Sequence, residues 1–176
     1  LCVILMLSFS FSAVALDDKY NIDELGMSIK VPKEYVVITR STEADDEALA
    51  TLKLDYNETM TAFSAADIYM QATSPDGVLK VTLTMDQDEN SEAINNYSDL
   101  STVERQKVLD MFLQNLSYTS GTEIKHNGNI YFDMALTQQS QEYVIYCYQC
   151  HTVVNGMNIN LSLEKNEEEL TQDEIK

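Results

Sequence analysis

One short string holds the densest chemistry in this chain. Residues 147–151 read CYQCH, with thiols at Cys147 and Cys150 and an imidazole at His151. This Cys-x-x-Cys-His spacing is that of the c-type haem attachment string, in which both thiols bind the haem vinyl groups and the imidazole ligates iron. Two thiols at this spacing also occur as redox or disulfide pairs. The string therefore leaves covalent haem, a redox pair and two structural thiols as alternatives.

The residues around this string favour packing over chemistry. Tyr143 to Val154 is apolar or aromatic at almost every position, which predicts an interior strand covered on both faces. In a strand, residues three apart point to opposite faces, with Cα atoms about 10 Å apart. That separation exceeds the limit of roughly 7 Å for a disulfide and would not present both thiols to one haem. We therefore expect Cys147 and Cys150 to be half-buried structural thiols, and we expect no cofactor.

A second group of residues imitates the start of a calcium loop. Asp86, Asp88 and Asn90 alternate as the first ligands of such a loop do. However, Ser91 replaces the glycine of the turn, and Tyr97 stands where the bidentate Glu belongs. The pattern predicts a solvated acidic loop, with a weak calcium site at Asp86, Asp88 and Asn90 as the alternative.

The common sequence signatures of enzymes do not occur. The chain contains no Gly-x-Ser-x-Gly elbow and no phosphate-binding loop. A hydrolase would need a pocket that unites His126 or His151 with a carboxylate. We therefore expect the protein not to be an enzyme.

Turn residues predict the strands that must position these side chains. Asn127-Gly128 and Asn155-Gly156 are hairpin turns, because both positions of a type I′ turn need positive φ. Ser74–Gly77 suits a type I turn. Around these turns, alternating apolar residues predict strands over residues 68–72, 79–85, 122–126, 130–137, 143–154 and 157–164. Residues 26–32 and 35–39 predict an opening hairpin on the edge of the sheet.

Two capping boxes and an apolar periodicity predict the helices. Ser101 and Glu104 begin a helix that runs to about Leu116. Residues 41–66 predict either one bent helix or two short ones. Thr171 and Glu174 form the second box, but the sequence stops at Lys176, so we expect this final helix to be truncated.

The N-terminus and the charge indicate where the protein works. Residues 1–15 form an apolar run that ends in Ala13-Val14-Ala15, which predicts a signal peptide clipped at its start. Residues 16–176 then form a single domain. The formal net charge of −18 repels phosphate backbones and anionic headgroups, so we expect no nucleic acid partner. We predict a secreted or extracytoplasmic protein, attached to a membrane only through an anchor beyond Lys176.

The order of these elements resembles that of a known family. An opening stretch Gly26-Met27-Ser28-Ile29-x-Val31-Pro32-x-x-Tyr35 is followed by a helical region, a hairpin, a long helix, a meander with Asn-Gly turns and a closing helix. This order resembles the PsbP/Mog-type α/β/α sandwich, which is found in many secreted bacterial domains. The resemblance implies an α+β fold with an antiparallel β-sheet flanked by helices. Because the family shares no catalytic signature, the resemblance assigns no ligand residue.

Two functions follow from these observations. Members of that family mostly act as binding or assembly modules, so the resemblance implies a non-catalytic extracytoplasmic module for an unidentified protein or small ligand. The alternative is a small exported c-type haem electron carrier that uses Cys147, Cys150 and His151.

Overall fold

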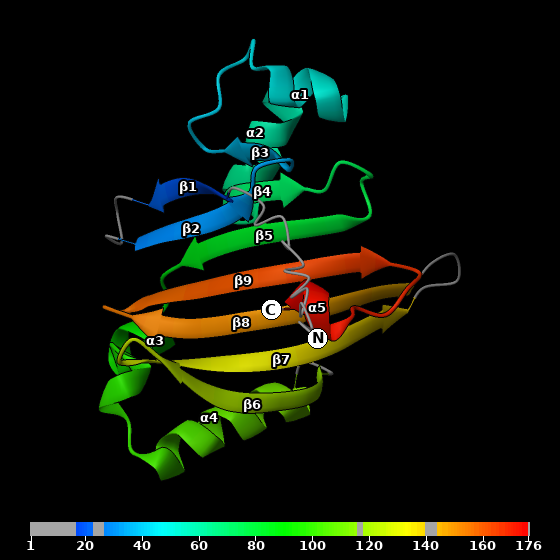
Figure 1. Cartoon of the computed structure of the whole chain (residues 1–176). Helices are drawn as coiled ribbons and strands as arrows, with labels where there is room; N and C mark the ends of the chain where they lie inside the picture. Colours follow the sequence, from blue (N-terminus) through cyan, green and yellow to red (C-terminus); the bar gives the residue numbers. More distant parts are fainter. Residues whose placement is uncertain (1–16, 23–26, 116–117, 140–143, 176) are drawn as a thin grey trace, which may run out of the picture. The chain divides into compact units, whose positions relative to one another are not determined.

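The computed structural model of this chain is an α+β structure, a seven-stranded antiparallel sheet with a few helices packed on it (Figure 1). It describes residues 17–22, 27–115, 118–139 and 144–175. The strands are β1 (Asp17–Ile22), β2 (Met27–Pro32), β3 (Val36–Thr39), β4 (Ile68–Thr73), β5 (Leu79–Asp86), β6 (Tyr118–His126), β7 (Asn129–Gln139), β8 (Val144–Val154) and β9 (Met157–Asn166). The helices are α1 (Glu47–Leu52), α2 (Tyr56–Ala65), α3 (Glu89–Ile94), the 3-10 helix η2 (Tyr97–Asp99), α4 (Thr102–Asn115) and α5 (Gln172–Ile175).

Several sequence predictions fall on residues that the structure does not describe. These are the signal peptide over residues 1–15, the start of the opening hairpin at Gly26, the end of the long helix at Leu116, the first strand residue Tyr143 and the terminal Lys176.

Contacts divide the chain into two compact units, one that ends at Tyr35 and one that begins at Val36. In the first unit, β1 and β2 pair as a two-stranded antiparallel sheet. The second unit contains the seven-stranded sheet and all helices of the described residues. The single domain over residues 16–176 stays a prediction.

In the large sheet the strand order is β3-β4-β5-β9-β8-β7-β6. The strands β6 to β9 form a meander, and two of its connections, β6–β7 and β8–β9, are the predicted Asn-Gly pairs. Asn127 and Asn155 adopt positive φ of 48° and 51°, and each is followed by a glycine in the same region. Both hairpins are therefore confirmed, and β8 is an interior strand as its continuous apolar run predicted.

The predicted opening hairpin is wrong. Its first strand, β2, pairs with β1, and its second, β3, is the edge of the large sheet and pairs with β4. Pro32 ends β2 because proline has no backbone N–H to donate to a ladder. The sequence gives no strong indication of β1, in which charged and polar residues outnumber apolar ones.

Residues 41–66 contain two short helices and not one bent helix. Lys53 ends α1 in the left-handed conformation, with φ of 56°, and Asp55 then caps α2 by accepting a hydrogen bond from the backbone N–H of Glu58. Both helices pack on one end of the sheet, where Ile38 of β3, Leu49 of α1 and Phe63 of α2 form a buried cluster.

The other end of the same sheet face carries α4. The predicted capping box is confirmed, because Ser101 N–H donates to Glu104 and Glu104 N–H donates to the Ser101 hydroxyl. Leu109 of α4 belongs to a buried cluster with Phe132, Met134 and other residues of β7 and β8.

Between the two helical ends, this face of the sheet is polar. A row of directly paired residues crosses all seven strands, from Ile38 through Gln71, Thr82, Ser162, Gln149 and Met134 to Gly121. The row is apolar only at its ends, under the helices. Buried apolar residues of β4, β5 and β9, which include Met70, Leu83 and Ile159, point to the opposite face.

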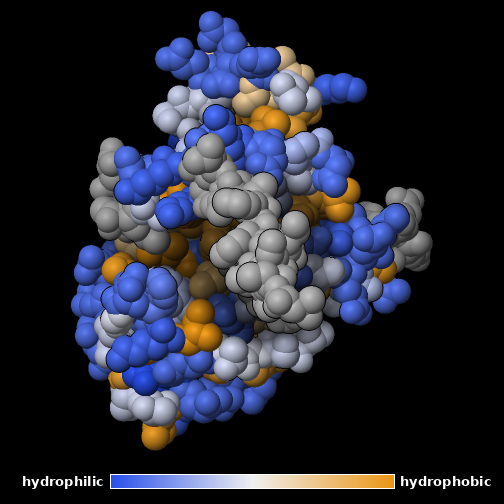
Figure 2. Space-filling model, viewed as in Figure 1, coloured by the Kyte–Doolittle hydropathy of each residue, from blue (hydrophilic) through white to orange (hydrophobic). Residues whose placement is uncertain are grey.

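On the view of Figure 2, hydrophilic residues cover most of the visible surface, in keeping with the net charge of −18.

Gly121 at the end of this row allows α4 to approach β6 closely. A Cβ atom on this residue would lie 3.0 Å from Leu109 Cδ1 and 3.1 Å from Leu113 Cδ2, and 3.2 Å from Met134 Cγ. We therefore expect Gly121→Val to lower the free energy of unfolding by about 1–3 kcal/mol, because the added methyl groups overpack the helix contact. Urea denaturation measures this loss.

Ser120→Val is the matched control, since Ser120 precedes Gly121 on β6 and its side chain is exposed. Ser120→Val introduces the same strand-favouring residue into β6 but adds no contact to α4. An equal loss of stability in both variants would contradict the close approach.

Candidate functional site

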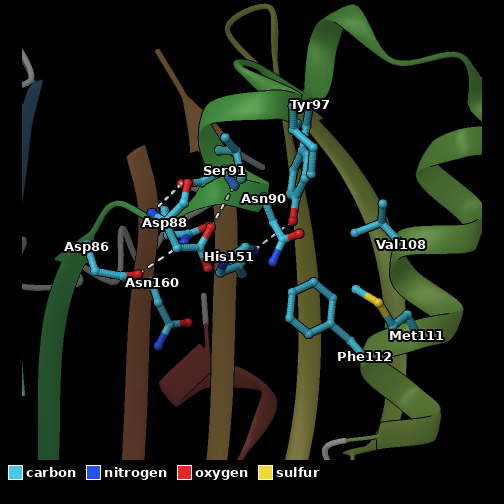
Figure 3. Close-up of a pocket in the computed structure, with 13 residues that line it drawn as sticks. Asp86, Asp88, Asn90, Ser91, Tyr97, Val108, Met111, Phe112, His151 and Asn160 are labelled. Carbon is cyan, nitrogen blue, oxygen red and sulfur yellow. Dashed lines mark hydrogen bonds between the residues drawn. The ribbon is translucent and has the colours of Figure 1, made fainter. Parts of the chain in front are cut away.

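A cavity of about 350 Å³ lies where β5, β8 and β9 meet α3, η2 and α4 (Figure 3). Its lining combines carboxylates, amides, a histidine and an apolar wall: Asp86, Asp88, Asn90, Ser91, Ile94, Tyr97, Val108, Met111, Phe112, His151, Val153, Asn158 and Asn160. In Figure 3 the polar side chains of β5, β9 and the start of α3 lie on one side, and the side chains of α4 lie on the other.

The acidic segment that was predicted to be a loop builds the polar side of this cavity. Asp86 ends β5, and its Oδ2 accepts a hydrogen bond of 3.1 Å from Asn158 Nδ2. Asp88 caps α3, with Oδ1 2.7 Å from the Ser91 backbone nitrogen. This N–H bond is the main cause that lowers the pKa of Asp88. Neither carboxylate forms an ion pair within the described part of the chain.

His151 lies between the polar side and the apolar wall. Its Nδ1 is 3.1 Å from the hydroxyl of Tyr97, and its ring centroid is 5.0 Å from that of Phe112. Burial lowers the pKa of His151 to about 4, although the charge of Asp88 opposes this shift. The imidazole is therefore neutral at physiological pH.

Asn160 of β9 is the direct cross-strand partner of His151. Its Oδ1 is buried and accepts no hydrogen bond from the described residues. A buried carbonyl oxygen without a donor is costly, so Asn160 leaves an unsatisfied acceptor in the wall of the cavity.

The two thiols of the predicted haem string do not meet. Both belong to β8, where Cys147 pairs with Leu136 and Glu164 on the cavity face, and Cys150 pairs with Asp133 and Leu161 on the other face. Both are free thiols, and burial raises the pKa of each to about 12. His151 alone of the string lines the cavity. These residues do not fit covalent haem.

The three predicted calcium ligands Asp86, Asp88 and Asn90 do line one cavity. Their backbone is a strand end followed by a helix start, however, and a calcium-binding loop would wrap around the ion. Among the described residues, no three His, Cys, Asp or Glu side chains cluster closely enough to hold a metal ion. The calcium site stays a prediction.

The cavity also brings together residues that the sequence did not indicate as partners. His151 joins two carboxylates, as a hydrolase would require, whereas His126 ends β6 and does not line the cavity. The sequence analysis assigned no site role to Phe112 or Asn160. It noted Tyr97 only as the residue that replaces the bidentate Glu of a calcium loop. Only the alternation along β9 could have placed Asn160 on the polar face.

A second hollow of about 390 Å³ lies near the turn between β4 and β5. Its charged residues include Lys80 and Glu164, which form an ion pair of 2.6 Å. The two charges of this ion pair neutralise each other. This hollow therefore offers a ligand fewer unpaired polar groups than the cavity beside His151 does.

The chain matches no protein-family model and no curated protein. Within the described residues, none of the helices is both long enough and apolar enough to cross a membrane.

Proposed function

We propose that this protein is a non-catalytic extracytoplasmic binding module that holds a small ligand in the cavity beside His151. This proposal rests on the cavity itself, which has an apolar wall on one side and, on the other, polar side chains that include Asn160 with its unsatisfied Oδ1. Its volume of about 350 Å³ falls within the range of ligand pockets.

The state of the polar groups favours binding over catalysis. A general base works best with a pKa near the operating pH, and the pKa of His151 is lowered to about 4. The hydroxyl of Ser91 is committed to the capping box, since it accepts from Asp88 N–H and donates to the Asp88 carbonyl. These groups are therefore poor candidates for a base and a nucleophile.

The location and the finer fold belong to the same proposal. The apolar run over residues 1–15 and the net charge of −18 support a place outside the cytoplasm. For the fold, we propose the PsbP/Mog-type α/β/α sandwich. It is supported by helices on both faces of the sheet. Helices α1, α2 and α4 pack on one face, and Glu174 of α5 binds Lys165, which points to the opposite face together with Ile159.

Histidine NMR tests whether the cavity binds ligands. The chain has only two histidines, so protein labelled in the histidine rings gives separate signals for His126 and His151. In a screen of neutral, acidic and basic fragments, we expect some compounds to shift the His151 signal saturably and leave the His126 signal in place.

Met111→Trp should weaken this response, because Met111 lines the cavity from α4 and the larger side chain would fill it. Gln114→Trp is the matched control, since Gln114 is exposed on the same helix and does not line the cavity. If no fragment shifts the His151 signal, or if both variants respond alike, the proposed function is wrong.

A further inference from the structure

We propose that the cavity beside His151 selects a small organic cation, an ammonium group on an apolar body. This inference rests on the proposed function and names the class of ligand. It follows from the charge of the lining, from its hydrogen-bonding groups and from the position of the apolar wall.

The charge of the lining requires a positive ligand. Asp86 and Asp88 are the only charged residues among the thirteen that line the cavity, and no Lys or Arg accompanies them. The charge of Asp88 acts inside the cavity, because it adds to the raised pKa of Tyr97 and opposes the lowering of the His151 pKa by burial. An anionic ligand would meet two carboxylates, whereas a cation would neutralise them.

The hydrogen-bonding groups require a donor. Asp86 and Asp88 are acceptors when ionised, and each already accepts one hydrogen bond. Asn160 Oδ1 is a further acceptor, and it has no partner among the described residues. An ammonium group has three N–H donors and no acceptor, so its hydrogen-bonding capacity matches a lining that offers acceptors. A hydroxyl group donates only one hydrogen bond.

The rest of the ligand must be apolar. Val108, Met111 and Phe112 of α4 face the carboxylates across the cavity, as Figure 3 shows. A bare metal ion would leave this wall without a partner, whereas an aliphatic or aromatic body would cover it. The aromatic rings of Phe112 and Tyr97 also favour a nearby cation.

Three probes with the same phenyl body test this assignment. Phenethylamine is cationic, 2-phenylethanol is neutral and 3-phenylpropionate is anionic. From the shift of the His151 signal, we expect phenethylamine to bind at least about tenfold tighter than 2-phenylethanol, as a charge-assisted hydrogen bond would give. We expect 3-phenylpropionate to bind most weakly.

The double variant Asp86→Asn/Asp88→Asn removes the charge and keeps the shape, and Asn also caps helices well. We expect it to reduce the affinity for phenethylamine to that for 2-phenylethanol. Asp110→Asn is the control, because Asp110 lies on α4, pairs with Gln106 and does not line the cavity. Its affinity for phenethylamine should equal that of the unmodified protein.

The outcomes separate this inference from the proposed function. If 2-phenylethanol or 3-phenylpropionate binds as tightly as phenethylamine, the cation preference is wrong while the cavity remains a binding site. If calcium chloride shifts the His151 signal and phenethylamine does not, the site is a metal site and the inference is overturned. If none of the probes or screening fragments shifts the signal, both proposals fail.

Discussion

Phe132→Ala is expected to lower the free energy of unfolding by about 3–5 kcal/mol, the usual cost of truncating a fully buried phenylalanine. Phe132 is completely buried in β7. Its ring centroid lies 4.6 Å from that of Tyr97 in η2 and 6.4 Å from that of Phe112 in α4. Truncation would therefore leave a void between the sheet and two separate helical elements, and these elements form walls of the cavity. Urea denaturation of the unmodified protein and the variant measures the loss.

Two further variants sharpen this experiment. Phe132→Leu keeps a large apolar side chain and should cost less than Phe132→Ala. Tyr131→Ala truncates an aromatic residue on the same strand whose side chain points to the opposite face and is only half-buried. A loss in Phe132→Ala no greater than that in Tyr131→Ala would show that this ring does not hold the helices to the sheet.

The parts of the fold that sequence could predict are those with local causes. Asn127-Gly128 and Asn155-Gly156 set positive φ within two residues, and Ser101 and Glu104 satisfy each other's backbone amides within one turn. The acidic segment was mistaken for a loop, because Asp88 and Ser91 form a capping box that differs from the Ser/Thr and Glu pattern.

Alternation predicted which residues share a face but not which face is covered. Phe132 and Leu83 both occupy apolar positions of alternating strands, yet they point to opposite faces of the same sheet. The difference depends on where α4 packs, which is a long-range property. For the same reason, the sequence did not predict the polar row between the helices.

The candidate site shows the same division. Asp86, Asp88 and His151 were each recognised by residue type, but for calcium and for haem separately. They share one cavity because β9 lies between β5 and β8, an order that the sequence pattern does not specify. Asn160 lies beside His151 because the two residues are direct partners in the β8–β9 register.

The protein is expected to lose stability as the pH falls from about 6.5 to about 4, because of His151. Its pKa is lowered to about 4 in the folded protein, mainly by burial, from an ordinary value of 6.5. Between these values the unfolded chain binds a proton that the folded protein does not bind, so acid favours unfolding. The full shift corresponds to about 3 kcal/mol. This stability is complete above pH 6.5 and is lost by about pH 4.

Comparing the unmodified protein with His151→Gln isolates this contribution, because a glutamine does not titrate and can still pair with Tyr97. Carboxylates such as Asp88, whose pKa is lowered, are common to both proteins, so the stability they lose in acid cancels in the difference. We expect the stability of His151→Gln, measured by urea denaturation at each pH, to fall less steeply between pH 6.5 and 4. His126→Gln makes the same substitution outside the cavity and serves as the control. Parallel curves for the unmodified protein and His151→Gln would show that the imidazole takes up its proton as easily in the folded protein as in the unfolded chain. The assignment of a neutral histidine beside the cavity would then be wrong.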